Sequence, residues 1–146
     1  MIQIVIANPN ESADILGIDK DVIGNDSRKK YLIKAIEENR CLVAKTDFSI
    51  VGFLIYSTDF FDCSFMALVV VHPLERKKGY AKSMIEHFEK ISPTQKVFSS
   101  TNQSNYKMKK LFVTIGYVKS GYVENLDDGD PEVFYFKKLD DSVSYR

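Results

Sequence analysis

An apolar run followed by a basic turn is the feature that most constrains the fold of this chain. Residues Phe65–Val71 are all apolar, long enough for a buried strand and short for a helix. Because Pro73 cannot donate a hydrogen bond to a sheet, strand pairing should end there. Beyond the turn, apolar residues recur at the spacing of one helical face: Ala81, Met84, Ile85, Phe88 and Ile91. The sequence therefore predicts a buried strand, a turn and an amphipathic helix.

The turn between this strand and this helix is suited to an anion. It carries three consecutive cations, Arg76, Lys77 and Lys78, followed by Gly79. The first turn of a helix has unpaired backbone N–H groups and the positive end of the helix dipole, so a phosphate there accepts hydrogen bonds directly. Gly79 lets the backbone approach a phosphate closely. The spacing matches neither G-x-x-x-x-G-K-[ST] nor G-x-G-x-x-G, so a plain, solvated basic turn is the alternative.

Two segments carry a resemblance to a known family. Arg76-x-x-Gly79-x-Ala81, after Val71-x-Pro73, resembles the acyl-CoA signature R/Q-x-x-G-x-G/A of the GNAT-type N-acetyltransferases. In that family this turn holds the pyrophosphate of coenzyme A. The later segment Asn105-x-x-Met108-x-x-Leu111-Phe112-x-x-x-Gly116-Tyr117 keeps the register of a second family pattern, N-x-x-A-x-x-L-Y-x-x-x-G-F. The resemblance implies a GNAT-like fold over Ile2–Leu139.

Turn and capping signals place the remaining elements. Besides the central strand, strands are predicted at Ile2–Ala7, Cys41–Lys45, Ile50–Thr58, Lys96–Thr101, Tyr117–Glu124 and Glu132–Lys138. A helix is predicted at Ser27–Arg40, capped by Asn25, Asp26 or Ser27. Another helix is predicted to open at Asn102-Gln103-Ser104, and a short helical turn is predicted over Ser12–Ile18. The order predicts an α/β (α+β) fold, with a mixed, mostly antiparallel sheet of about six to seven strands and helices on both faces.

Composition narrows the class of protein. The 146 residues suit one domain over 1–139, followed by a polar tail over 140–146. A formal net charge of zero gives no indication of a nucleic-acid partner. Neither a membrane span of about 18 apolar residues nor a signal peptide is evident. Cys41 and Cys63 lack C-x-x-C spacing, which favours reduced thiols in a cytoplasmic protein, and the only histidines, His72 and His87, form no metal-ligand pattern.

The resemblance also implies a reaction and a set of binding residues. Acetyl-CoA would be the cosubstrate, without a metal, and a primary amine would attack its acetyl group within a ternary complex. Backbone N–H groups of the central strand would hold the acyl carbonyl, a contribution of about a few kcal/mol in such sites. The implied cofactor-binding residues are Val69, Val70, Val71, Arg76, Lys77, Lys78, Gly79, Tyr80, Ala81, Lys82, Asn105 and Phe112. For Asn105, a solvent-facing position at a helix start is the plain alternative.

The catalytic acid and base stay unassigned. An alkyl amine with a pKa of about 10.4 is neutral in about one molecule in 2,500 at pH 7, so supplying the free base requires about 4.6 kcal/mol. The glutamate that many relatives use for this falls at Phe65, and the tyrosine that protonates the leaving thiolate falls at Phe112. Six acidic residues either attract the cationic amine or are simply solvated: Asp59, Asp62, Glu124, Asp127, Asp128 and Asp130. Three tyrosines either replace the missing phenol or pack in the core: Tyr106, Tyr117 and Tyr122.

Three hypotheses compete on this sequence. The favoured one is an N-acetyltransferase that acts on a small-molecule or peptide amine. The second, which the two phenylalanines favour, is a weak or inactive CoA-binding sensor on the same fold. The third is an unrelated strand-turn-helix protein that binds another phosphorylated ligand. The acceptor is not indicated by any motif, and the aromatic late strands could support a homodimer.

Overall fold

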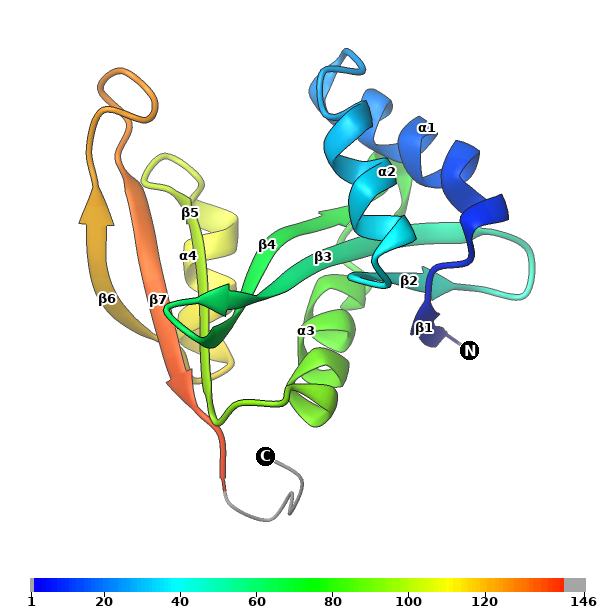
Figure 1. The fold of residues 1–146 in the computed structure, drawn as a ribbon. Helices are drawn as coiled ribbons and strands as arrows, with labels where there is room; N and C mark the ends of the chain where they lie inside the picture. Colours follow the sequence, from blue (N-terminus) through cyan, green and yellow to red (C-terminus); the bar gives the residue numbers. More distant parts are fainter. Residues whose placement is uncertain (1, 141–146) are drawn as a thin grey trace. The chain divides into compact units, whose positions relative to one another are not determined.

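The computed structural model describes residues 2–140, so the predicted tail over 140–146 lies outside the described residues apart from Asp140. Its strands are β1 (Gln3–Ile6), β2 (Cys41–Lys45), β3 (Ile50–Phe60), β4 (Cys63–Val71), β5 (Lys96–Asn102), β6 (Val118–Val123) and β7 (Glu132–Lys138). Its helices are α1 (Ser12–Ile23), α2 (Lys29–Glu37), α3 (Tyr80–Ile91) and α4 (Tyr106–Thr114), with short 3-10 helices η1 (Pro9–Glu11) and η2 (Pro73–Glu75) (Figure 1).

Backbone hydrogen bonds link the seven strands of the described chain in the order β1-β2-β3-β4-β5-β7-β6. β4 and β5 run parallel, whereas β1–β2, β2–β3, β5–β7 and β6–β7 are antiparallel. The predicted mixed, mostly antiparallel sheet with helices is therefore confirmed. The chain divides into two compact units, Met1–Tyr56 with Leu68–Phe88 and Ser57–Ala67 with Glu89–Arg146.

The first unit has helices on both sides of its strands. α1 and α2 lie on one side of β2 and β3, and α3 lies on the other (Figure 1). This arrangement explains why residues 41–44 and 51–55 are buried at every position instead of at alternate ones. The largest fully buried side chains of this unit come from all of these elements: Ile15, Leu32, Ile36, Leu42, Phe53, Leu54, Ile55, Met84, Ile85 and Phe88.

The first helix is longer than the sequence predicted. α1 extends to Ile23, beyond the predicted turn over Ser12–Ile18, and ends at Gly24 in the left-handed conformation, with φ of 84°. Asp19 interrupts the apolar pattern of this helix, yet its side chain is buried, because the Arg28 guanidinium binds both of its carboxylate oxygens. A buried carboxylate is tolerated when it is paired in this way.

The second helix is shorter than predicted, and the predicted caps are wrong. It spans Lys29–Glu37 rather than Ser27–Arg40, and its N-cap residue is Arg28, which makes no side-chain capping bond. The Asn25 side chain instead accepts a hydrogen bond from the Ser27 N–H at 2.9 Å, in the turn before the helix. The chain leaves α2 through Asn39, whose φ of 59° turns it into β2.

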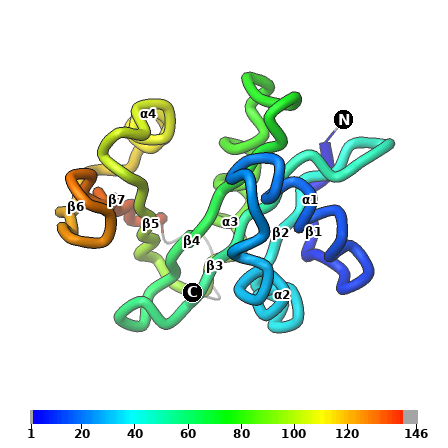
Figure 2. Tube along the Cα trace, turned by 90° about the horizontal axis from the view of Figure 1, so that it is seen from above, coloured from blue at the N-terminus to red at the C-terminus, as the bar shows by residue number. Residues whose placement is uncertain are grey.

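The second unit is a sheet covered by one helix. α4 lies on one side of β5 and β7 (Figure 2), and its Phe112 stacks on Tyr135 of β7, with ring centroids 4.9 Å apart. The side chains that alternate with Tyr135 point to the opposite face, where Phe98, Phe134 and Phe136 are half-buried. β4 joins this unit through a short parallel register of Ser64–Met66 with Val97–Ser99.

Two element boundaries in this unit also differ from the predictions. α4 begins at Tyr106 rather than at Asn102-Gln103-Ser104, because the Asn102 and Ser104 side chains bind Asp127 and Asp130 of the β6–β7 loop. β3 continues to Phe60 and β4 starts at Cys63, so the turn between them holds only two residues, Phe61 and Asp62, with φ of 50° and 64°.

Candidate functional site

The candidate site of the first unit begins where β4 ends. The His72 N–H still donates to the Val51 carbonyl of β3 at 2.8 Å, and Pro73 then starts η2, as its missing N–H favours. The His72 Nδ1 accepts a hydrogen bond from the Leu74 N–H at 3.1 Å, and its Nε2 lies 3.3 Å from Asp21 Oδ2. His72 therefore fixes the exit of the chain from the strand and is occupied by structural contacts.

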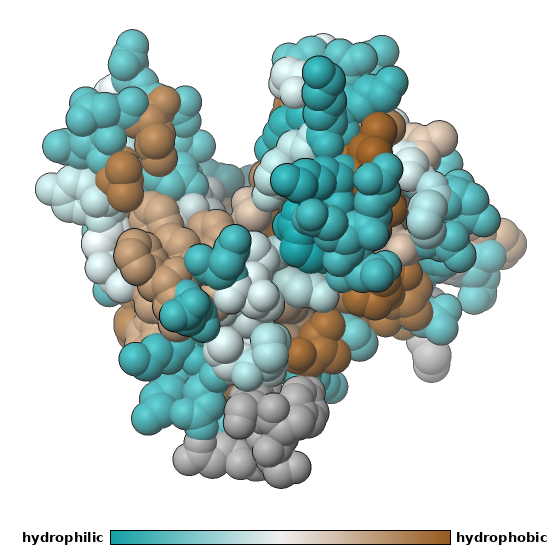
Figure 3. Space-filling view, in the orientation of Figure 1, coloured by the Kyte–Doolittle hydropathy of each residue, from teal (hydrophilic) through white to brown (hydrophobic). Residues whose placement is uncertain are grey.

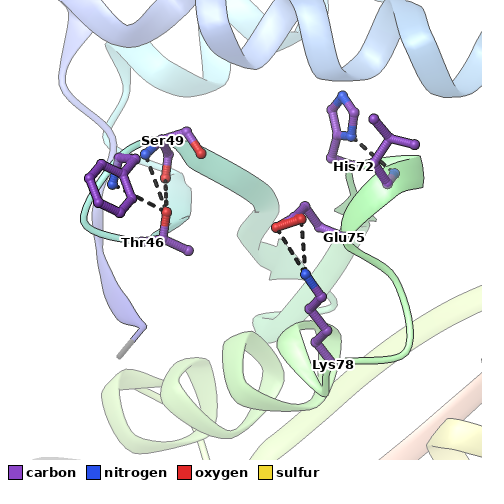
Figure 4. A network of polar contacts seen from close by, with 7 residues as sticks. Thr46, Ser49, His72, Glu75 and Lys78 are labelled. Carbon is purple, nitrogen blue, oxygen red and sulfur yellow. Dashed lines mark hydrogen bonds and ion pairs between the residues drawn. The ribbon is translucent and has the colours of Figure 1, made fainter.

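The basic turn follows, and its cations are exposed. Arg76, Lys77 and Lys78 all lie on the surface, with Arg76 Nε 3.4 Å from the Val71 carbonyl. Lys78 Nζ lies 3.1 Å from the Glu75 carboxylate, an ion pair drawn in Figure 4. Since one carboxylate offsets one of three cations, the turn keeps an excess of positive charge. Such a turn attracts a polyanion.

Gly79 gives this turn the backbone shape that a phosphate site needs. Its φ is 80°, a left-handed conformation that side chains rarely adopt, and a Cβ built on it would meet no protein atom within 4 Å. α3 starts at the next residue, and its first turn is closed by the Ser83 N–H donating to the Gly79 carbonyl at 3.0 Å. The preceding N–H groups of a helix start have no partner within the helix, so the open side of Gly79 can admit a phosphate.

The remaining predicted residues of this unit flank the turn. Tyr80 and Ala81 are half-buried and Lys82 is exposed, all in the first turn of α3. Of the three valines that end β4, Val70 is buried and its two neighbours are half-buried. A Cβ on Gly52 of β3 would lie 2.7 Å from the Val70 carbonyl oxygen, so only glycine permits the close approach of the two strands here.

Asn105 and Phe112 belong to the second unit, and each has a structural contact there. Asn105 is the N-cap of α4, and its Oδ1 accepts a hydrogen bond from the Met108 N–H at 3.2 Å. Phe112 is fully buried between Tyr117 and Tyr135. Both contacts account for these residues locally, and their part in cofactor binding stays a prediction.

The three candidate phenols have different surroundings. Tyr117 is buried and donates a hydrogen bond to Glu89 at 2.8 Å; burial, with the nearby Glu89 carboxylate, raises the pKa of its phenol. Tyr106 is 75% exposed, with Lys109 Nζ 5.4 Å from its ring centroid. Tyr122 is 63% exposed on β6. Tyr117 thus has the core position that the sequence left open as the alternative.

The carboxylates and Phe65 can be placed in the same way. The Phe65 ring is stacked on Phe60, with centroids 4.7 Å apart, and offers no group for proton transfer. Asp127 and Asp130 bind Asn102 and Ser104, so part of the acidic loop organises the β5–α4 connection. The other acidic candidates are exposed: Asp59, Asp62, Glu124 and Asp128.

Two polar pairs escaped the sequence analysis. Asp19 and Arg28 join α1 to α2, and Ser100 Oγ donates to Glu132 Oε2 at 2.7 Å across β5 and β7. Ser100 and Glu132 lie on the same face as Phe98 and Phe134, because alternate residues of a strand share a face. Alternation was visible in the sequence, but the register that joins these strands was not. Among residues 2–140, no cluster of three or more His, Cys, Asp or Glu side chains is placed to hold a metal ion.

The mixed sheet and the basic turn at a helix start define an α/β protein suited to a phosphorylated ligand. The family model of the acetyltransferase (GNAT) family matches residues 13–117 of the sequence, which is more than half of the chain. The chain therefore belongs to that family. Acetyl-CoA-dependent acetyl transfer is general in this family. A comparison with curated proteins gave no match.

Solved structures agree with this assignment. An acetyltransferase of the GNAT family from Bacillus cereus is 49% identical, with a TM-score of 0.91 over 95% of this chain and 98% of that one. The ribosomal-protein-S18-alanine N-acetyltransferase of Escherichia coli shares the fold at 14% identity, with a TM-score of 0.83 over 95% and 94% of the two chains. YncA of Salmonella typhimurium, solved with its cofactor acetyl-CoA, has 16% identity and a TM-score of 0.78 over 96% and 95%. Within residues 2–140, no helix is long and apolar enough to cross a membrane.

Proposed function

We propose that this protein is an N-acetyltransferase that moves an acetyl group from acetyl-CoA to a primary amine by direct attack within a ternary complex. One observation carries the proposal: a member of the acetyltransferase family keeps the basic turn, with Gly79 at φ 80° and open space on its free side. The amine nitrogen would form the new C–N bond, and the C–S bond of the thioester would break with CoA leaving as its thiolate. The amine proton would pass to solvent, and the thiolate would take up a proton from solvent. Bound acetyl-CoA supplies the activated acetyl thioester.

The residues of the first unit have distinct parts in this proposal. Arg76 and Lys77 would bind the pyrophosphate oxygens together with the backbone N–H groups around Gly79. Lys78, held by Glu75, would keep the turn in shape and add positive charge. The backbone of Val69–Val71 would face the acyl carbonyl, where one donor contributes about a few kcal/mol to the transition state. Asn105, which belongs to the second unit, would contact the pantetheine arm.

Phe65 and Phe112 favour a second candidate, a CoA-binding sensor with weak or no turnover. Neither side chain can move a proton, and both are packed among other aromatic rings. An amine of depressed pKa and a thiol leaving group of pKa about 8.5 can react without a dedicated acid. Catalysis without these two groups is therefore chemically reasonable, and turnover decides between the candidates.

The first test is thermal denaturation with acetyl-CoA, ATP or NAD. A ligand at 100 times its dissociation constant adds about 2.7 kcal/mol, which raises the melting temperature of a domain of this size by about 5–10 °C. We expect this shift in melting temperature with acetyl-CoA and not with ATP or NAD. No shift, or an equal shift with ATP, would overturn the cofactor assignment. A panel of primary amines, with CoA release measured by a thiol reagent, then separates an enzyme from a sensor, because a sensor binds acetyl-CoA without releasing CoA.

A further inference from the structure

His72, the residue after β4, satisfies the backbone N–H groups of η2. The Leu74 N–H donates to the His72 Nδ1 at 3.1 Å, and Figure 4 shows the ring with this bond. The Glu75 N–H donates to the His72 carbonyl at 2.8 Å, and Pro73 has no N–H to satisfy. His72 is therefore the N-cap of η2, a position that Asn, Asp, Ser or Thr usually occupies.

η2 leads directly into the turn that we propose binds the pyrophosphate. Glu75, the last residue of η2, pairs with Lys78 Nζ at 3.1 Å. Within the turn, Lys77 has φ of 67° and Gly79 has φ of 80°, both in the left-handed region. A residue with a side chain rarely adopts this conformation, so the turn depends on contacts that hold its shape. The cap on η2 supplies one such contact, because it fixes the position of Glu75.

The cap requires the His72 ring to be neutral. Because the Leu74 N–H donates to Nδ1, the single ring proton lies on Nε2, which is 3.3 Å from Asp21 Oδ2 on α1. A second ring proton would lie on Nδ1 and point at the Leu74 N–H, so that two donors would face each other. Protonation of the ring therefore keeps the contact with Asp21 and breaks the cap. Histidine is the side chain that ordinarily changes charge between about pH 5 and 8.

The groups around the ring allow it to gain and lose this proton. On α1 the charged partner is Asp21, whose side chain is 61% exposed, and the surface over α1 and α2 is largely hydrophilic (Figure 3). Beyond η2, Lys78 is paired with Glu75, and Arg76 Nε faces a backbone carbonyl. Among residues 2–140, the His72 ring has no further hydrogen bond or ion pair. An exposed carboxylate favours the imidazolium only weakly, so it does not hold the ring in the charged form.

We infer that His72 is a positioning residue for acetyl-CoA, whose neutral ring holds η2 and the turn Arg76–Gly79 in the binding conformation and whose protonation releases them. The inference rests on the proposed function, because it concerns the same turn. The binding conformation excludes the second ring proton, so affinity is complete where the ring is neutral and falls as the pH decreases through the range in which histidine is protonated. An Asn at this position would cap η2 through its Oδ1 without titrating.

Isothermal titration calorimetry of acetyl-CoA between pH 6 and pH 8 tests the inference. His72→Leu, which has no acceptor for the Leu74 N–H, should bind about fivefold more weakly than the parent at pH 8, as expected for the loss of a cap. His72→Asn should restore the affinity at pH 8. Between pH 8 and pH 6, the affinity of the parent should fall about fivefold more than that of His72→Asn.

Two comparisons make this difference specific to His72. The phosphates of acetyl-CoA also titrate in this range, but their effect is common to the parent and His72→Asn and cancels in the ratio of the two affinities. His87→Asn is the matched control, because it makes the same substitution at the only other histidine of the chain and should keep the pH dependence of the parent. A merely structural role would lower the melting temperature of His72→Leu and leave the pH profiles of the parent and His72→Asn parallel.

The outcomes distinguish this inference from the proposed function. A parent that does not bind acetyl-CoA at pH 8 would reject both. Binding by the parent with equal pH dependence in His72→Asn, or unchanged affinity in His72→Leu at pH 8, would reject the role of His72 and leave the acetyltransferase in place. Loss of the pH dependence in His87→Asn would also reject it, because the sensitive group would then lie elsewhere. Weaker binding in His72→Leu, with recovery and a flatter pH profile in His72→Asn, supports it.

Discussion

Gly79 sets the backbone shape of the turn that we propose binds the pyrophosphate. Gly24 serves as a comparison, because it separates a loss of ligand binding from the backbone strain that any side chain would cause at such a position. Gly79 and Gly24 have nearly the same φ, 80° and 84°, and a built Cβ meets no protein atom within 4 Å at either position. A side chain at either residue therefore carries the same conformational penalty. Only at Gly79 would it also occupy the space that we assign to the pyrophosphate.

We predict that Gly79→Ala and Gly24→Ala each lower the free energy of unfolding by about 1 kcal/mol, as expected for a left-handed glycine. Only Gly79→Ala should weaken acetyl-CoA binding, by about tenfold or more, and Gly79→Asp should abolish it because its charge repels the phosphates. Urea denaturation and isothermal titration calorimetry measure the two quantities. Equal affinity in the parent and Gly79→Asp would show that the phosphates lie elsewhere.

Helices α1 and α2 depend on one ion pair that crosses from one to the other. The Asp19 carboxylate is buried and held by two guanidinium contacts, with 3.1 Å between Arg28 Nε and Asp19 Oδ2. The arginine side chain is 30% exposed, so water screens the pair in part. Glu75 and Lys78, on η2 and the turn, form a less buried comparison, since their side chains are 28% and 52% exposed whereas the Asp19 side chain is 4% exposed.

We predict that Asp19→Ala lowers the free energy of unfolding by about 2–3 kcal/mol, because it leaves the Arg28 guanidinium without its partner. A double-mutant cycle with Arg28→Ala should give a coupling energy of about 1 kcal/mol or more, against less than about 0.5 kcal/mol for Glu75→Ala with Lys78→Ala. Urea denaturation of seven proteins, the parent with two single mutants and one double mutant for each pair, provides both cycles. Similar coupling energies in the two cycles would mean that burial does not strengthen the first pair.

The same elements show what a sequence can predict. The bounds of β2 and β7 were predicted as observed, because apolar alternation and turn residues are local signals. The turn Arg76–Gly79 was located for the same reason. The end of α1 was missed, because the burial of Asp19 depends on an arginine nine residues later. The contact between Ser100 and Glu132 was missed because it needs the register of β5 and β7, which periodicity leaves undetermined.

For the molecule as a whole, buried acidic groups make stability depend on pH above neutrality. Burial, with a smaller effect of Glu11, raises the pKa of the Cys41 thiol to about 12. Burial also raises the pKa of Tyr117, with Glu89 beside it. In the unfolded chain a cysteine ionises at a pKa of about 8.5. Between these values the folded chain keeps a proton that the unfolded chain loses, so stability is complete below pH 8.5 and falls as pH rises toward 12.

We therefore predict that the free energy of unfolding falls between pH 9 and pH 10.5 by about 1 kcal/mol per pH unit through Cys41, with Tyr117 adding to the loss at the upper end. Cys41→Ala should have a smaller slope in this range, although its stability at pH 7 is lower by about 1–2 kcal/mol because the substitution removes a buried side chain. Cys63→Ala, whose thiol is half-exposed, is the control and should keep the parent slope. Urea denaturation at half-unit pH intervals measures the three slopes. Parallel curves for Cys41→Ala and the parent would show that the buried thiol does not govern the alkaline limit of this fold.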